Sequence, residues 1–377
     1  MTEPDPYDDI EYRAETLLDD VEYDAELAKR MARDARGVTN GVLSEAEFHE
    51  RYRGQVSEEF DLDIPPYDEL ESDEESLGAQ ATSRRTVLTA AGVAAGVATA
   101  GFAGYLDATG ETDLAGSTDD GDTAASAQTI EIPEASMGMV IDTTACVRCL
   151  QCVEACKEEN KTEEGTFWMY VNRYQREDRE YEDETEAESL PLPCMHCDDA
   201  PCVRVCPNNS RIQHQDGRVL CNYDTCLGCK YCEVACPYHV NTFVTNGTAD
   251  ELQAEFEYDQ VDEKGRTVAG PPHEGSCSKC TFCAHRRFEE DLRGTTACSE
   301  ACPVNAIQFG DFDDPESDPN QYLEDVDEAD TFQLHTDASN PNIIYVGDDP
   351  TGVETRRVRG PTTHEDLGLE APDQYGK

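Results

Sequence analysis

The stretch CLGCKYCEVACP, residues 226–237, decides the fold of this chain. Its four cysteines are separated by two, two and three residues, and a proline follows the last of them. Related stretches recur, so that seventeen of the eighteen cysteines fall into four short groups. The groups are Cys146-x2-Cys149-x2-Cys152-x3-Cys156; Cys194-x2-Cys197-x4-Cys202-x3-Cys206-Pro207; Cys226-x2-Cys229-x2-Cys232-x3-Cys236-Pro237; and Cys277-x2-Cys280-x2-Cys283 followed by Cys298-x3-Cys302-Pro303.

This spacing is typical of iron–sulfur ligands. In the run C-x2-C-x2-C-x3-C-P, three cysteines hold one cubane and the fourth ligates the neighbouring cluster. Three cysteines two residues apart lie on a loop that can wrap a cubane. The fourth begins a helix, where the missing N–H of a following proline costs nothing; only Cys156 is followed by another residue, Lys157. Sixteen ligands predict four [4Fe–4S] clusters, and therefore a chain that conducts electrons.

Zinc and disulfides are the two alternatives for these cysteines. Structural zinc uses paired C-x2-C units separated by a spacer, and it has no use for a third cysteine at x2 and a fourth at x3. Disulfides would fit an exported protein, but cysteines packed this densely in a chain of 377 residues are not a typical disulfide framework. The spacing favours iron–sulfur clusters over both.

The composition is strongly acidic. The formal net charge is -53, from 82 Asp and Glu against 29 Lys and Arg. A nucleic-acid partner is excluded, because phosphate contacts require basic patches. The acids are dispersed along the chain, which favours adaptation to high salt over docking to a basic partner. At about 1 M salt the Debye length falls to roughly 3 Å and the self-repulsion is screened.

Residues 1–82 are predicted to form an acidic, partly helical leader. Apolar residues at near-helical spacing predict an amphipathic helix from Ile10 to Ala35. Ser44-x-x-Glu47 predicts a capping box that opens a second helix. One face of this second helix would carry Phe48, Tyr52 and Val56. The leader is either a small helical hairpin that binds a partner or a loosely ordered segment.

Residues 83–106 carry a predicted export signal. The stretch SRRTVL (83–88) precedes an Ala- and Gly-rich apolar run, as in a twin-arginine signal. The run is also long enough to anchor the chain in a bilayer, with the arginines inside and the cysteines on the outer face of the cytoplasmic membrane. ATA (98–100) is a candidate cleavage site, and cleavage and anchoring stay open. A buried helix with a chance Arg-Arg pair is the remaining alternative.

The rest of the chain divides into a linker and two further parts. Residues 107–138 read as a flexible linker, residues 139–310 as a cluster domain and residues 311–377 as an acidic extension. Short strands are predicted at 139–142, 306–310 and 342–346. Two insertions, 157–191 and 237–276, interrupt the cluster domain.

Specific words around the cysteines resemble a known family. They are PCMHCDDAPC (193–202), CLGCKYC running into ACPY (226–238), and KCTFCAHR (279–286). They resemble the four-cluster, ferredoxin-like electron-transfer subunits of respiratory molybdopterin oxidoreductases, of the dimethyl sulfoxide, polysulfide and tetrathionate reductase type. The resemblance implies an α+β fold of two bacterial-ferredoxin-like modules related by a pseudo-twofold axis. It covers residues 139–347.

The resemblance also implies that ligands are exchanged between the groups. One cluster would be held by each of the following sets: Cys146, Cys149, Cys152 and Cys302; Cys156, Cys280, Cys283 and Cys298; Cys194, Cys197, Cys202 and Cys236; and Cys206, Cys226, Cys229 and Cys232. Cys221 and Cys277 are left out as small buried residues, although Cys277 is an alternative to Cys280. His196, His239 and His285 lie beside ligands in sequence and are interpreted as residues around the clusters.

The implied function is electron transfer without substrate chemistry on this chain. Electrons would pass between a polytopic, quinol-oxidising membrane subunit and a molybdopterin catalytic subunit of an anaerobic respiratory reductase. The alternative is the electron-transfer subunit of a membrane-bound hydrogenase or formate dehydrogenase. A structural zinc scaffold is a third hypothesis, which an absorbance spectrum would exclude.

Overall fold

The structure is a computed structural model that describes residues 10–68 and 135–368, apart from 20, 22, 184–185, 245–248, 335, 351–352 and 359–360. The predicted export segment 83–106, its cleavage site and the predicted linker up to residue 134 lie outside the described residues. The described part is a mixture of short helices and small sheets, which confirms the α+β class. No helix among the described residues is long and apolar enough to cross a membrane.

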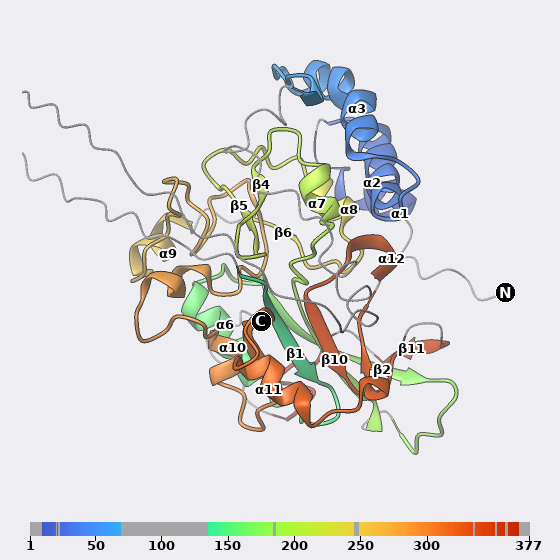
Figure 1. The fold of residues 1–377 in the computed structure, drawn as a ribbon, viewed down its shortest axis with the longest axis vertical. Helices are drawn as coiled ribbons and strands as arrows, with labels where there is room; N and C mark the ends of the chain where they lie inside the picture. Colours follow the sequence, from blue (N-terminus) through green and yellow to red (C-terminus); the bar gives the residue numbers. More distant parts are fainter. Residues whose placement is uncertain are drawn as a thin grey trace, which may run out of the picture. The chain divides into compact units, whose positions relative to one another are not determined.

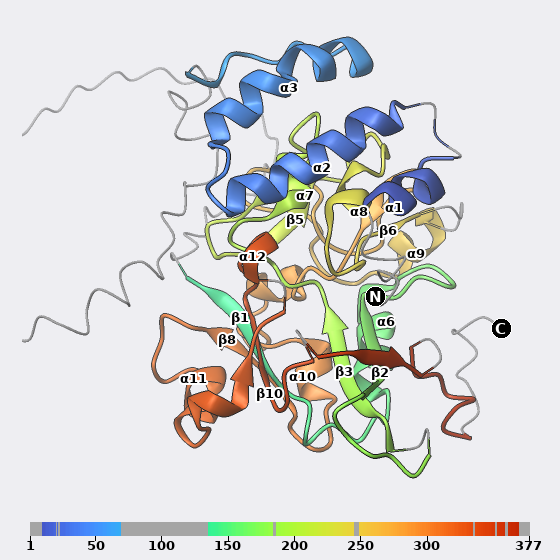
Figure 2. The ribbon, with the colours of Figure 1, turned by 90° about the vertical axis from the view of Figure 1, so that its right-hand side faces the viewer.

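A four-stranded sheet lies at one end of the described chain (Figures 1 and 2). Its order is β8 (Ile307–Asp311), β1 (Met137–Asp142), β10 (Ile343–Val346) and β9 (Thr331–Phe332). β1 pairs antiparallel with β8 and parallel with β10. All of β1 is buried, as expected of a nearly continuous apolar run between two neighbouring strands. The three predicted strands are confirmed, each within two residues of its boundaries.

A second sheet is built largely from the first insertion. β2 (Met169–Arg176) pairs antiparallel with β3 (Glu188–Pro193) and with β11 (Thr355–Arg357). Trp168, directly before β2, is buried, and its Nε1 donates to Ser278 Oγ at 3.1 Å. The insertion is therefore fixed to the segment that precedes the last cysteine group.

Short elements carry or separate the cysteines. The helices are α6 (Gln151–Asn160), α7 (Pro201–Arg204), α8 (Tyr231–Ala235), α9 (Ala249–Glu255), α10 (Ala297–Glu300), α11 (Asp318–Glu324) and α12 (Thr336–Ser339), with 3-10 turns at Ala284–Phe288 and Glu328–Asp330. Two-stranded pairs join β4 (Arg211–Gln213) to β5 (Val219–Cys221), and β6 (Thr242–Phe243) to β7 (Cys277–Ser278). Proline opens α7 at its first position, where no backbone hydrogen bond is lost.

Three helices make up the described part of the leader: α1 (Ile10–Leu17), α2 (Ala25–Thr39) and α3 (Glu45–Phe60). The predicted single helix from Ile10 to Ala35 is wrong, because the chain breaks after α1 and restarts at Asp24. The Asp24 carboxylate accepts from the N–H groups of Glu26 and Leu27 at 2.8 and 3.1 Å, which begins a new helix.

The capping box that begins α3 is confirmed. Ser44 Oγ accepts from Glu47 N–H at 3.2 Å, and Ser44 N–H donates back to Glu47 Oε2 at 2.9 Å. Phe48, Tyr52 and Val56 are the buried residues of α3, on one face as predicted.

The leader packs against the helices that carry two of the cysteine groups. α1 and α2 contact α8, and α2 also contacts α7 and α12 (Figures 1 and 2). Leu27 and Met31 share one apolar cluster with Tyr231 and Val234 of α8. The described leader and residues 135–368 therefore belong to one compact unit.

Candidate iron–sulfur centres

The loops between cysteines share a backbone conformation that local sequence permits. In the run 146–152, Arg148 and Leu150 have left-handed backbones, with φ of 58° and 64°. Gly228 and Lys230 occupy the same offsets in the run 226–232, with φ of 66° and 62°. Alternating left- and right-handed residues turn successive N–H groups to one side, which makes a concave site for an anion.

The Cys-Pro corners form a second repeated geometry. The third residue after the cysteine is left-handed in each of them, at Asn209, His239 and Asn305. This turn directs the following N–H groups back at the cysteine sulfur. Ala306 N–H lies 3.2 Å from Cys302 Sγ, and Arg211 N–H lies 3.3 Å from Cys206 Sγ.

Further backbone N–H groups reach the sulfurs of other cysteines. His196 N–H contacts Cys194 Sγ and Phe282 N–H contacts Cys280 Sγ, both at 3.4 Å. Ala297 N–H contacts Cys283 Sγ at 3.5 Å. Such N–H groups stabilise thiolates and the sulfurs of a bound cluster, which is how a protein adjusts the reduction potential of iron–sulfur centres.

The structure gathers the sixteen predicted ligands into four sets, each with its cysteines close enough for their charges to interact. Group 1 is Cys146, Cys149, Cys152 and Cys302; group 2 is Cys156, Cys280, Cys283 and Cys298; group 3 is Cys194, Cys197, Cys202 and Cys236; group 4 is Cys206, Cys226, Cys229 and Cys232. These are the sets that the family pattern implies. The assignment of each cysteine as an iron ligand stays a prediction.

The four groups follow one another in a line. Cys152 of group 1 interacts with Cys156 and Cys298 of group 2. Cys280 of group 2 interacts with Cys194 of group 3. Groups 3 and 4 are joined by α8, which carries Cys232 and is followed directly by Cys236.

Exposure to solvent differs between the ends and the middle of this line. Every cysteine of groups 2 and 3 is buried. The partly exposed cysteines all belong to the two outer groups: Cys146, Cys149 and Cys302 in group 1, and Cys206 and Cys226 in group 4. Electrons can therefore enter and leave at the ends, while the middle is insulated from solvent.

The side chains present fit four iron–sulfur cubanes. Cavities lie at groups 2 and 3 and are lined by all four cysteines of each group. Burial, together with neighbouring cysteines, raises the pKa of Cys156 and Cys197 well above the ordinary thiol value. Thiolates so placed need a cation to hold them, and iron ions supply that charge.

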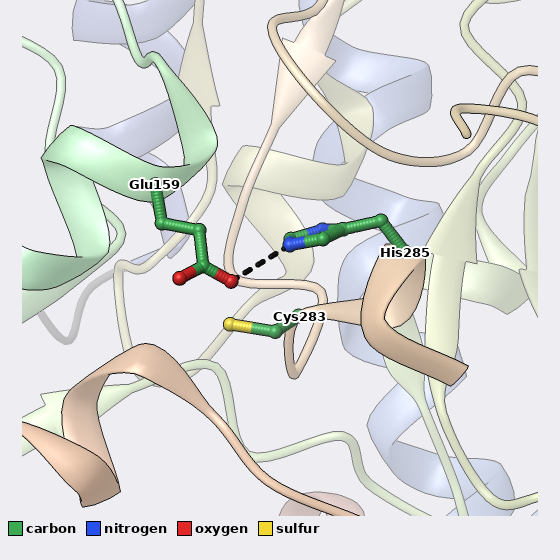
Figure 3. A group of neighbouring side chains, drawn as sticks. All are labelled: Glu159, Cys283 and His285. Atoms are coloured by element: carbon green, nitrogen blue, oxygen red, sulfur yellow. Dashed lines mark hydrogen bonds and ion pairs between the residues drawn. The ribbon is translucent and has the colours of Figure 1, made fainter. Parts of the chain in front are cut away.

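Glu159 and His285 lie beside group 2 and were not linked by the sequence reasoning. The ligand atoms of Glu159, Cys283 and His285 lie within 4.8 Å of one another (Figure 3). His285 Nε2 is 2.8 Å from Glu159 Oε1, and Arg286 donates to both carboxylate oxygens. Burial would raise the pKa of Glu159, but these hydrogen bonds overcome it and hold the pKa at about 2. Because Cys283 belongs to group 2, we interpret the trio as part of that cluster's surroundings.

Two of the three histidines predicted to surround clusters are fully buried. His196 Nδ1 accepts from Val219 N–H at 2.9 Å, and its ring stacks on Phe282 with centroids 3.7 Å apart. Burial, with Lys279 and Arg218 nearby, lowers the pKa of His196 far below its usual value, so the ring is neutral. His285 is equally buried, whereas His239 is exposed.

The two cysteines left out of the ligand set both lie at group 4. A hydrogen bond from Cys221 lowers the pKa of Cys226 to about 5, and one from Cys277 lowers the pKa of Cys232 to about 6. Cys280 lies instead in group 2, so the structure lends no support to Cys277 as its substitute. Six sulfurs therefore surround group 4.

Comparison with known proteins places this geometry in a family. Models of the 4Fe-4S dicluster domain match residues 138–215 and 185–269, and a model of the N-terminal region of 4Fe-4S ferredoxins matches residues 5–68. A Halobacterium salinarum protein assigned as an iron–sulfur subunit of dimethyl sulfoxide reductase is 36% identical over 220 residues, covering 55% of this chain and 78% of its own length.

Two further relatives agree. The arsenate respiratory reductase iron–sulfur subunit of a Shewanella species is 35% identical over 232 residues, covering 56% of this chain and 95% of its own length. A tetrathionate reductase subunit of Salmonella typhimurium is 33% identical over 215 residues, covering 57% and 74%. The chain belongs to the family of iron–sulfur subunits of respiratory reductases. As a member of this family it binds four [4Fe–4S] clusters and transfers electrons.

Proposed function

We propose that this subunit relays electrons, one at a time, between a quinol-oxidising membrane subunit and a molybdopterin catalytic subunit. The observation that carries the proposal is the line of four cysteine groups with partly exposed cysteines at the two ends alone. A chain that docks two redox partners needs a route open at two points and closed between them. The clusters supply the one-electron chemistry, and the protein supplies spacing, insulation and charge.

We also propose the complete ligand set of groups 1 to 4 and a pseudo-twofold relation between two ferredoxin-like modules. The equal offsets of left-handed residues in the runs 146–152 and 226–232 support that relation. Each module contributes three cysteines of one run to its own cluster and a fourth to the neighbouring cluster, as in two-cluster ferredoxins.

Export by the twin-arginine pathway remains our proposal for localisation. Its support is Arg84-Arg85 before a weakly apolar run. The chemical reason is that clusters are inserted before transport, so a folded chain has to cross. Changing both arginines to lysine should leave the subunit, and any partner that travels with it, in the cytoplasm. Unchanged delivery to the outer face would refute this localisation.

The relay is tested on the complex purified anaerobically through a tag on this subunit. We expect molybdenum and a polytopic membrane protein to co-purify, and a quinol to reduce the clusters. One oxidant from a panel of dimethyl sulfoxide, tetrathionate, arsenate and selenate should then reoxidise them. Clusters that no quinol reduces, or a preparation without molybdenum, would contradict the proposal.

A further inference from the structure

Arg211 is a buried cation among the sulfurs of groups 3 and 4. It begins β4 directly after the Cys-Pro corner of Cys206, and its side chain is 2% exposed. Its Nη2 lies 3.7 Å from Cys232 Sγ and donates to Cys277 O at 3.2 Å. Its charge also interacts with Cys202 and Cys221.

Nothing in the described part of the chain neutralises this cation. The structure gives Arg211 no ion pair there, and its Nε and Nη1 have no hydrogen-bond partner although both are buried. The nearby carboxylate of Glu233 faces Cys277 instead, with Oε1 3.5 Å from Sγ. Moving a guanidinium out of water without a partner is strongly unfavourable, so the fold has to provide a negative charge at this place.

The other buried basic residues near the cysteines are satisfied differently. Lys279 donates to the carbonyls of Val219 and Cys280. Lys157 is surrounded by the carbonyls of Thr162, Glu163 and Thr166. Arg286 pairs with Glu159 and Glu300. Arg211 differs from all of these because its nearest polar neighbours are cysteine sulfurs.

We propose that Arg211 is the fixed counter-charge of the group 4 cluster and raises its reduction potential above that of the other clusters. The proposal rests on the ligand set proposed above. A cluster held by four thiolates is an anion, and the added electron makes it more negative. A buried cation a few ångströms away therefore stabilises the reduced form more than the oxidised form. Hydrogen bonds from Cys221 and Cys277 act in the same direction.

The consequence is an electron well at one end of the line. Group 1, at the other end, has the half-buried Arg148 as its charged neighbour, where water screens the charge. Electrons should therefore rest at group 4 when the complex is partly reduced.

The experiment is a redox titration of the purified holo-complex, followed by EPR. In Arg211→Gln, one of the four clusters should shift to a more negative potential. At fixed ambient potential its reduced-to-oxidised ratio should fall at least tenfold, which is about 59 mV for a one-electron couple. Arg211→Lys keeps the charge and should restore most of the shift. The matched control is Arg173→Gln, which removes a buried arginine paired with Asp366 at 3.3 Å.

Iron analysis separates this proposal from the ligand assignment. Each variant should retain about sixteen iron per chain, whereas an error in the ligand set would appear as full iron in a group 4 cysteine variant. No shift in Arg211→Gln, or an equal shift of all four clusters, would overturn the role of Arg211. If the glutamine variant does not load, the lysine variant decides. Full iron with a nearly unchanged potential supports a charge effect, and loss of a cluster there as well shows a packing role.

A second inference rests on the leader. Arg13 of α1 is 4% exposed, and it donates to the carbonyls of Cys236, at 2.6 Å, and Glu233. These carbonyls lie at the end of α8, where a basic side chain is favourable. Tyr231 Oη donates to Asp24 O at 2.8 Å. Cys229 itself belongs to the apolar cluster that the leader helices complete.

We infer that the leader and the cluster domain stay on the same side of the membrane as one folded body. A single membrane crossing between residues 68 and 135 would separate Arg13 from Cys236. Cleavage at residues 98–100 would leave the leader without a covalent link. Either event would uncover the apolar face of α8 and three backbone or side-chain hydrogen-bond partners.

Epitope tags at the two ends of the full chain test this inference in sealed vesicles of known orientation. Both tags should be accessible from one face, whichever face it is, and should lie on one chain of full length. Tags on opposite faces, or a mature chain that begins after residue 100, would overturn the inference. As a second measurement, Arg13→Ala should lower the melting temperature of the holo-protein, and an unchanged value would count against leader docking.

Discussion

Groups 1 and 4 are the two ends of the same line of cysteines, yet they are built differently. Group 1 follows β1, and the Asp142 side chain at the end of that strand accepts from Thr144 and Ala145 N–H at 2.8 and 2.9 Å. It is supported by a sheet and by backbone. Group 4 is supported by the leader helices and by Arg211, with the extra thiols of Cys221 and Cys277 around it.

The difference shows that exposure and charge are set separately. Both ends have partly exposed cysteines, so both can exchange electrons with a partner. Only at group 4 do buried cation and thiols act on the same sulfurs, among the residues that the structure describes. The fold can therefore keep two open ends and still give them different affinities for an electron.

Salt should have the largest effect, and it should act on group 4 first. A chain of net charge -53 repels itself unless ions screen it. The leader packs on group 4 alone of the two ends, so its release should remove that cluster's cover. Lowering KCl from molar to millimolar should unfold the chain, with the group 4 EPR signal lost at higher salt than the group 1 signal. Equal melting temperatures in dilute buffer and concentrated KCl would refute this expectation.

Ligand substitutions should affect the two ends alike. Cys149→Ser and Cys229→Ser each remove one proposed ligand, and each should lower the iron content by about a quarter of the roughly sixteen atoms. Cys221→Ser and Cys277→Ser are matched controls from group 4 and should keep full iron. Iron and sulfide analysis after anaerobic purification measures this. A quarter of the iron lost in either control would show that the ligand set is wrong.

A cavity in the leader should weaken one end of the line. Leu27 is 2% exposed in the cluster shared with α8, and Leu27→Ala should lower the free energy of unfolding by about 2–5 kcal/mol. The group 4 signal should broaden or shift while the group 1 signal stays. Thermal melting and EPR in molar KCl test both statements. The exposed Val42→Ala is the control and should change neither.

The smallest effect is expected from pH, through a pair close to β4. Glu263 lies 3.0 Å from His214 Nε2, and Arg287 is also nearby. Burial would raise the pKa of Glu263, but these partners lower it to about 2. Because the folded pKa is depressed, the stabilisation is present above the unfolded value near 4.5 and is lost as the pH falls toward 2.

Glu263→Gln should therefore destabilise the fold by about 1 kcal/mol at pH 7, a value reduced for the partial exposure of the pair. The difference from the unaltered protein should shrink as the pH is lowered to 3. Denaturant unfolding in molar KCl at several pH values measures it. A difference that stays constant between pH 7 and pH 3 would assign the effect to packing instead of charge.

Local features of this protein were readable from its residues. The cysteine spacing predicted the cofactor, and the words around the cysteines implied four sets that the structure brings together. Ser44 and Glu47 predicted the start of α3, and short apolar runs predicted β1, β8 and β10. These features depend on residues only a few positions apart, whose geometry the backbone alone restricts.

Other features depended on contacts between distant parts of the chain. The break at Asp24, the parallel pairing of β1 with β10, and the meeting of Glu159 with His285 have no local signature. The same holds for Arg211, which in sequence is one basic residue among 29. The sequence by itself determined which residues could hold iron. Tertiary packing decided which groups became the ends of the line and which cation stayed buried, because burial depends on everything that covers a residue.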